Sequence, residues 1–396
     1  MTPDRTAPPA RPARRGGLLV NLALSLAALA LSLVAAEAAI RLFGRSSPSL
    51  LVADRVVGKR FLPDFRSRVF VPECDCEVDL RFNRDGLRGP DRPYAKPPGV
   101  KRIALVGDST VSAVATAEER TLARALERIL TAARPDVTWD VMNAGVSSSS
   151  TGSELALYRE VLARYSPDLV VLVFWVGNDL ADNSLALTQA PRLYFDLDPD
   201  GRLRQLPFAF EPNPVAEWLD RTSRLYVWQK SALRQARASL RARGGALEPV
   251  ELVFAQPEPE AAAHAWAITG ALLRAFREET AARGTPLVVV AAPAPVQVYD
   301  DLWAELERRA GLQRTPLRRD HPEERLRGLC EGAGVPFLAL APAFQAEAPH
   351  RDSTRRAEQL YYEGRFHWND AGNALAATSI HDFLVSSSDP VRLPPR

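Results

Sequence analysis

The chain contains little cysteine, and its few cysteines do not follow a metal-binding pattern. There are three in 396 residues, Cys74, Cys76 and Cys330. Cys74 and Cys76 are too close in sequence for a relaxed disulfide, although strained ones exist, and no second pair completes a zinc-type spacing. A phosphate-binding glycine loop and an HExxH motif are also missing. These absences predict neither a metal nor a cofactor, and they favour a surface turn that carries two thiols.

Outside its N-terminus the sequence has no excess of one charge. The net charge is +2, and residues 1–15 alone carry four arginines against one aspartate, a net +3, so the remainder is close to −1. A body without a basic excess gives no electrostatic reason to expect nucleic-acid binding. Hydrophobic residues make up 46% of the chain and charged residues 25%, a composition that excludes wholesale disorder.

Charge is absent from Leu18 to Ala36, a run of 19 residues with one asparagine and two serines. A helix of that length is about 28 Å long, close to the hydrocarbon thickness of a bilayer. The arginines before it predict a cytoplasmic N-terminus and a body across the membrane. Ala36-Glu37-Ala38 has the shape of a signal-peptide cleavage site, but the apolar run exceeds an ordinary signal core. We therefore predict a retained single-pass anchor in the cell membrane, with the body extracytoplasmic (periplasmic in a Gram-negative cell).

The chain is predicted to have four parts. They are a cytoplasmic basic tail (1–17), a transmembrane signal-anchor (18–36), a juxtamembrane stalk with an irregular lead-in (37–100), and a folded domain (101–396) with an insertion at about 190–260. The lead-in is rich in Arg, Pro and Asp, with one short strand predicted at Val78 to Phe82. The insertion combines a hairpin at Leu193 to Leu206 with an aromatic helical segment at Glu217 to Arg241. We expect it to cap the carboxyl edge of the sheet.

Apolar runs and helical periods alternate after residue 100. The predicted strands are 103–106, 139–142, 169–176, 287–291 and 336–340, and the predicted helices are 121–131, 154–165, 261–283, 323–331 and 370–385. The run from Leu169 to Val176 is apolar on both faces, as in a central parallel strand. Strands that alternate with helices predict an α/β fold with a parallel sheet covered on both faces.

Polar residues follow the ends of the first three predicted strands, where open parallel sheets place their sites. They are Gly107-Asp108-Ser109, Asn143-Ala144-Gly145 and Gly177-Asn178-Asp179, and His367 precedes the last helix. Each motif alone fits an ordinary turn or helix cap. Their order is more informative than any one of them.

This order resembles the SGNH, or GDSL, hydrolase family, over about Arg102 to Val385. The segments Glu37-Ala-Ala-Ile-Arg41 and Asn83-Arg-Asp-Gly-Leu-Arg88 also resemble its membrane-anchored bacterial members. The resemblance implies a three-layer, flavodoxin-like fold and ester hydrolysis through a serine acyl-enzyme. It implies Ser109 as the nucleophile and His367 as its base. The oxyanion donors would be the backbone N–H groups of Ser109 and Gly145 and the side-chain amide of Asn178, while Asp108 holds the loop.

One position departs from the family pattern. The family places an aspartate three residues before the histidine, and this chain has Gly364 there. Glu363 is the tentative acid in its place, a Ser–His dyad is the second reading, and lost activity is the third. The functional alternatives are an esterase acting on O-acyl groups of envelope glycan or lipid, an O-acyltransferase with the same site, and a catalytically silent module that binds envelope polymers.

Overall fold

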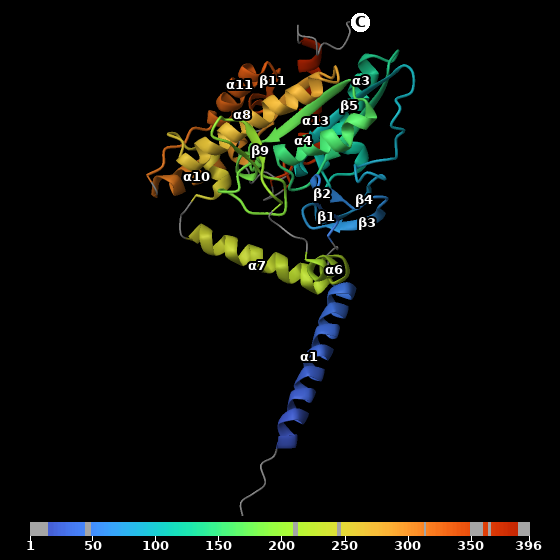
Figure 1. Ribbon diagram of the computed structural model, residues 1–396, viewed down its shortest axis with the longest axis vertical. Coiled ribbons are helices and arrows are strands. Elements are labelled where there is room, and N and C mark those ends of the chain that lie inside the picture. The colour runs from blue at the N-terminus through green and yellow to red at the C-terminus, as the bar shows by residue number, and fades with distance from the viewer. Residues whose placement is uncertain are drawn as a thin grey trace, which may run out of the picture.

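The computed structural model describes residues 15–43, 49–208, 213–243, 247–312, 314–348, 359–362 and 366–386. They form a layered α/β domain from which one long helix projects (Figure 1). The predicted α/β class is confirmed.

The centre of the domain is a parallel sheet of five strands. In chain order they are β5 (Val100–Gly107), β6 (Thr138–Gly145), β7 (Leu169–Trp175), β10 (Leu287–Ala292) and β11 (Phe337–Ala339). In space the order is β6-β5-β7-β10-β11, which is the 2-1-3-4-5 order of flavodoxin-like sheets. Because β5 and β7 are neighbours in this order, the residues that follow them come close together at the carboxyl edge.

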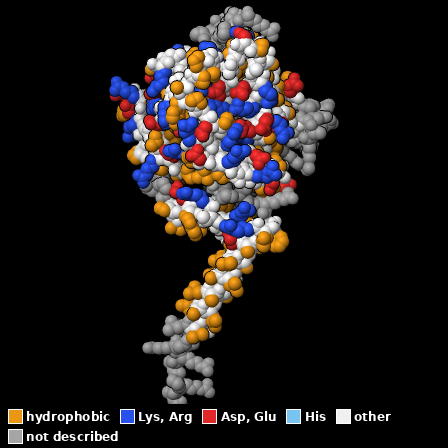
Figure 2. Space-filling view, turned by 90° about the vertical axis from the view of Figure 1, so that its right-hand side faces the viewer, with side chains coloured by type: hydrophobic (Ala, Val, Ile, Leu, Met, Phe, Trp, Pro, Cys, Tyr) orange, Lys and Arg blue, Asp and Glu red, His pale blue; other side chains and the backbone are white. Residues whose placement is uncertain are grey.

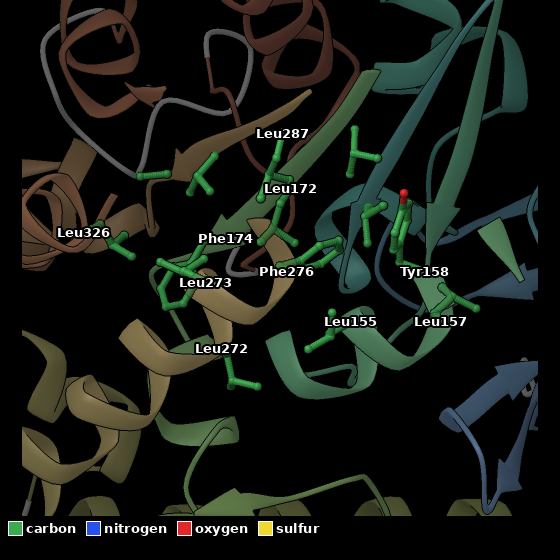
Figure 3. Packing of buried hydrophobic residues seen from close by; sticks show 14 of the residues in the cluster. Leu155, Leu157, Tyr158, Leu172, Phe174, Leu272, Leu273, Phe276, Leu287 and Leu326 are labelled. Atoms are coloured by element: carbon green, nitrogen blue, oxygen red, sulfur yellow. The ribbon is translucent and has the colours of Figure 1, made fainter. Parts of the chain in front are cut away.

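Helices cover both faces of the sheet. The predicted ones appear as α3 (Leu122–Ala133), α4 (Thr151–Glu160), α8 (Glu260–Ala281), α11 (His321–Ala333) and α13 (Asp370–Ser386). The side chains of β7 point alternately into two hydrophobic clusters. Leu172 and Phe174 belong to the first cluster, which also contains residues of α4, α8 and α11. Val171 and Val173 belong to the second cluster, which contains residues of α3 and α13. Figure 3 shows the first cluster. This two-sided burial explains the continuous apolar run of the strand.

Further helices and 3₁₀ turns lie in the connections between these elements. They are α2 (Ser109–Ser112), α5 (Asp179–Asp182), α9 (Pro295–Val298), α10 (Asp300–Leu312) and α12 (Ala341–Glu347), with the 3₁₀ turns η1 (Glu118–Arg120), η2 (Leu162–Tyr165) and η3 (Pro249–Phe254).

The segment before residue 100 is more ordered than the predicted stalk and lead-in. It contains two antiparallel hairpins, β1 (Leu51–Asp54) with β2 (Gly58–Phe61) and β3 (Arg66–Val71) with β4 (Cys76–Arg81). Phe61 and Phe82 stack with ring centroids 4.1 Å apart in a small cluster of their own. Arg88, buried, donates to the carbonyls of Ser112 (2.6 Å) and Thr116 (2.5 Å). The lead-in is therefore fastened to the loop that follows β5.

The insertion divides into a hairpin and two helices. The hairpin, β8 (Phe195–Leu197) and β9 (Leu203–Gln205), is where the sequence predicts it. The predicted aromatic helix is interrupted at Ser223, giving α6 (Pro214–Thr222) and α7 (Arg224–Arg243). In Figure 1, α7 runs across the end of the projecting helix.

The projecting helix, α1 (Arg15–Phe43), contains the predicted anchor. Its part from Val20 to Phe43 is long and apolar enough to cross a membrane, with a mean hydropathy of 2.1. None of that window is buried in the protein, and Figure 2 shows hydrophobic side chains along it, in contrast to the mixed charges on the globular part. A core helix of a soluble protein would bury such residues.

Candidate active site

Ser109 and His367 meet at the carboxyl edge of the sheet. Ser109 directly follows Asp108 at the end of β5, and His367 precedes α13. The Nε2 atom of His367 lies 2.7 Å from Oγ of Ser109 although 258 residues separate them. Asp108 is fully buried, and its Oδ1 accepts the N–H of Thr110 at 2.8 Å. Asp108 is thereby the N-cap of α2 (Ser109–Ser112).

The carboxylate on the other side of His367 belongs to Glu73. Its Oε1 lies 2.7 Å from Nδ1 of His367, and it stands in the turn between β3 and β4. Since a carboxylate only accepts, Nδ1 carries the proton and Nε2 is left to accept the hydroxyl proton of Ser109. Glu363, the acid that the sequence suggested, lies outside the described residues. Among the residues that the structure describes, Glu73 is the carboxylate that contacts the imidazole.

Sequence reasoning missed Glu73 for two reasons. It precedes the boundary predicted at residue 101, and 294 residues separate it from His367. A signal was present, because Gly364 left the histidine without its usual carboxylate. An acidic residue in the segment before residue 101, such as Glu73 beside the two cysteines, was a candidate to replace it.

The surroundings of His367 favour its charged form. Burial by itself lowers the pKa of His367, but the hydrogen bond and charge of Glu73, with the charge of Asp108, outweigh burial and raise it. Trp175 lies beside the imidazole, with ring centroids 6.0 Å apart. An imidazolium formed during proton transfer is thus stabilised by Glu73.

Cys74 and Cys76 are joined by a disulfide in the same turn as Glu73. The prediction of two free thiols was wrong, because the turn brings their Cα atoms to 5.1 Å, within the usual range for a disulfide. The bond closes the chain immediately after Glu73 and so restricts the backbone that carries the carboxylate.

We expect that loss of this disulfide displaces Glu73 and thereby slows the ester hydrolysis expected at Ser109. The Cys74→Ser/Cys76→Ser variant should lose about 10²-fold in kcat, the order expected when a catalytic group shifts by about 1 Å. A reductant should slow the wild-type protein similarly and leave the double variant unchanged. Reduction of the disulfide is verified by counting free thiols. If the reduced protein keeps the full wild-type rate, the disulfide does not position Glu73.

The predicted oxyanion donors are not equally placed. The Nδ2 atom of Asn178 lies 3.3 Å from Oδ2 of Asp108, beside the nucleophile, and its buried Oδ1 has no partner among the described residues. The N–H of Gly145 already donates to Oδ1 of Asn143 at 3.1 Å. A Cβ at Gly145 would lie 2.2 Å from the backbone nitrogen of Ser112. This glycine therefore lets β6 approach α2 closely, and its role as an oxyanion donor stays a prediction.

Two more carboxyl groups are buried behind the nucleophile. Burial and then the charge of Asp108 hold the pKa of both Glu154 and Asp179 well above the usual value for such groups. Helix α2 has four residues, too few for a strong macrodipole. The charges that raise the pKa of His367 are those of Glu73 and Asp108.

A hollow of about 740 Å³ lies behind the disulfide turn. It is lined by the two cysteines, by residues of β3 and β4 and by Tyr362, and neither Ser109 nor His367 lines it. Several of its charges are already paired, as in the contacts of Arg68 with Asp79 and of Arg81 with Glu118. The hollow is therefore separate from the proton-transfer pair.

No family model matches the chain, and no curated protein matches it in sequence. Solved structures resemble it at low identity. An α/β hydrolase from the metagenome of Lake Arreo, Spain, is 13% identical, covering 73% of this chain and 96% of its own, with a TM-score of 0.39. An acetyl-xylooligosaccharide esterase from Geobacillus stearothermophilus is 13% identical (71% and 93% covered, TM-score 0.38). The acetyl xylan esterase AlAXEase is 14% identical (71% and 98% covered, TM-score 0.39). Similarity at this level identifies no substrate.

Proposed function

We propose that the protein is a serine esterase of the SGNH type, held in the membrane by α1 with its catalytic domain outside the cytoplasm. The observation that carries the proposal is the chain of two 2.7 Å contacts from Ser109 through His367 to Glu73. A hydroxyl, an imidazole and a carboxylate in this order are the parts of a serine nucleophile with an oriented base.

The geometry supports a two-step acyl transfer. Nε2 of His367 takes the proton of Ser109 while Oγ attacks the ester carbonyl, and the backbone N–H of Ser109 and the amide of Asn178 donate to the resulting oxyanion. The tetrahedral species then expels the alcohol, which receives the proton from His367. The acyl group remains bound to Oγ of Ser109. Water, deprotonated by His367, attacks this ester and releases the acid and free Ser109.

The substrate class follows from the proposed location. An extracytoplasmic enzyme meets esters on envelope glycans and lipids, so we propose an O-acyl group on one of these. Product analysis with an acceptor glycan distinguishes hydrolysis from transfer, because a transferase would move acyl label into the polymer.

A fluorophosphonate probe tests the proposal directly. Such a probe phosphonylates an activated serine, so the full-length protein should be labelled, and Ser109→Ala and His367→Ala should not. Ser67→Ala, an exposed serine on β3, is the matched control and should be labelled like the wild type. Labelling that persists in both site variants would refute Ser109 as the nucleophile.

The pH profile should reveal the charge beside His367. The base must be neutral, and Glu73 raises the pKa of His367, so kcat/KM should fall as the pH drops through that raised value. Glu73→Gln removes the charge and should move the acidic limb to lower pH. Glu77→Gln, exposed on the neighbouring strand, should leave the limb in place. A limb that does not move in Glu73→Gln would exclude electrostatic coupling between the two residues.

A further inference from the structure

Helices α6 and α7 form a surface that the domain core does not use. None of the side chains of α6 is buried, and no described residue of either helix belongs to the three hydrophobic clusters. Their main contacts within the described chain are with each other and with α1. Trp218 is 61% exposed, Trp228 56% and Leu233 53%. Large exposed apolar side chains in one region indicate an interaction surface.

The sequence of α7 is amphipathic and basic. It contains six basic residues and no acidic one: Arg224, Lys230, Arg234, Arg237, Arg241 and Arg243. At about 100° per residue, five large apolar residues fall within one arc of about 160°: Leu225, Tyr226, Trp228, Leu233 and Leu240. Of the six basic residues, all but Arg243 fall outside that arc. A helix of this composition is typical of those that lie in a membrane interface.

The start of α7 is fastened to the point where the apolar span of α1 ends. Glu37 is the first charged residue after the uncharged run. Its carboxylate accepts the backbone N–H groups of Arg224 and Leu225, both at 3.0 Å, and the hydroxyl of Ser223 at 2.9 Å. Arg41 donates to the carbonyl of Thr222. If residues 18–36 fill the hydrocarbon layer, these contacts set the first turn of α7 at headgroup level.

We propose that α6 and α7 lie on the membrane and that α7 binds the anionic phospholipid headgroups of the leaflet from which the domain emerges. The inference rests on the proposed anchoring by α1. Charge complementarity supports it, since each Lys or Arg near an anionic surface contributes favourably. The exposed tryptophans fit the same place, because tryptophan is enriched at membrane interfaces. The orientation in Figure 1, with α7 across the end of α1, allows both contacts at once.

Tryptophan fluorescence can test this in the full-length protein. Five of the seven tryptophans are buried, and the exposed pair is Trp218 and Trp228. The protein is placed in nanodiscs of phosphatidylcholine and phosphatidylglycerol, with bromine at a shallow position of the acyl chains. We expect shallow bromines to quench part of the emission and deep bromines to quench less. The quenching should disappear in Trp218→Phe/Trp228→Phe and persist in the control Trp139→Phe.

A second arm tests the headgroup charge. Arg234→Gln/Arg237→Gln/Arg241→Gln should abolish the dependence of quenching on the phosphatidylglycerol fraction. The control variant loses the same charge on the globular part: Arg202→Gln/Arg204→Gln/Arg308→Gln. Its quenching should still depend on the phosphatidylglycerol fraction. Equal quenching of the wild type in purely zwitterionic discs would overturn anionic recognition.

The outcomes distinguish a failure of the membrane-surface position of α6 and α7 from a failure of the membrane anchoring by α1. A wild-type protein that co-elutes with nanodiscs but is not quenched by shallow bromines refutes the membrane-surface position of α6 and α7 while α1 remains an anchor. A protein that does not enter nanodiscs refutes the anchor itself. In both cases, an assay of ester hydrolysis tests the Ser109 site independently.

Discussion

Replacing Ser109 by alanine is expected to lower kcat for short p-nitrophenyl esters by about 10⁶-fold, which is the loss seen when a serine protease loses its nucleophile. The Oγ atom in contact with His367 is the atom that would carry the acyl group. Without it no acyl-enzyme forms, and the residual rate reflects only the remaining oxyanion donors and substrate binding.

The control for this prediction is Ser112→Ala at the other end of α2. Its hydroxyl contacts the carbonyl oxygen of Ser109 and Oγ of Ser147, at 3.2 and 3.1 Å, and does not contact His367. This variant should keep most of the activity and should be equally well folded by circular dichroism. Hydrolysis by a purified Ser109→Ala protein at a rate near that of the wild type would eliminate the acyl-serine mechanism.

The sequence was sufficient to predict the sheet, because apolar runs mark its strands and parallel strands end at one edge. The pairing of Ser109 with His367 was expected only from the resemblance to the SGNH family, since His367 lies before the last helix and not at the end of a strand. The element boundaries differ by a few residues, as they do at the ends of helices.

The rest depended on contacts between segments that no local pattern relates. Glu73 reaches the imidazole because the β3–β4 hairpin lies beside the segment that follows β5, where Arg81 contacts Glu118, and nothing near residue 73 encodes that docking. The resemblance gave Gly145 a donor role, but only coordinates reveal that its N–H donates to Asn143 and that α2 leaves no room for a Cβ. The break between α6 and α7 is a third case, since Glu37 on a distant helix caps α7.

Replacing Glu73 by glutamine is the second change with a large expected effect. An amide of the same shape can present its NH₂ group to Nδ1, which favours the tautomer with the proton on Nε2 and leaves Ser109 without an acceptor. It also removes the charge that stabilises the imidazolium. The corresponding loss in serine proteases is about 10⁴-fold in kcat. We expect a similar loss here, with KM for a small ester nearly unchanged, because Glu73 does not touch the acyl group.

Two further variants locate the effect in the triad. Glu77→Gln lies on the same hairpin, and its side chain is exposed, so it should retain wild-type kcat; it controls for the loss of one negative charge nearby. Glu363→Gln compares the acid suggested by the sequence with the one in contact with His367. Its kcat should fall far less than that of Glu73→Gln. If Glu363→Gln instead loses about 10⁴-fold and Glu73→Gln stays active, the carboxylate that orients the base is Glu363. Equal and near-wild-type rates in both would leave a Ser–His dyad, in which His367 is oriented without any carboxylate.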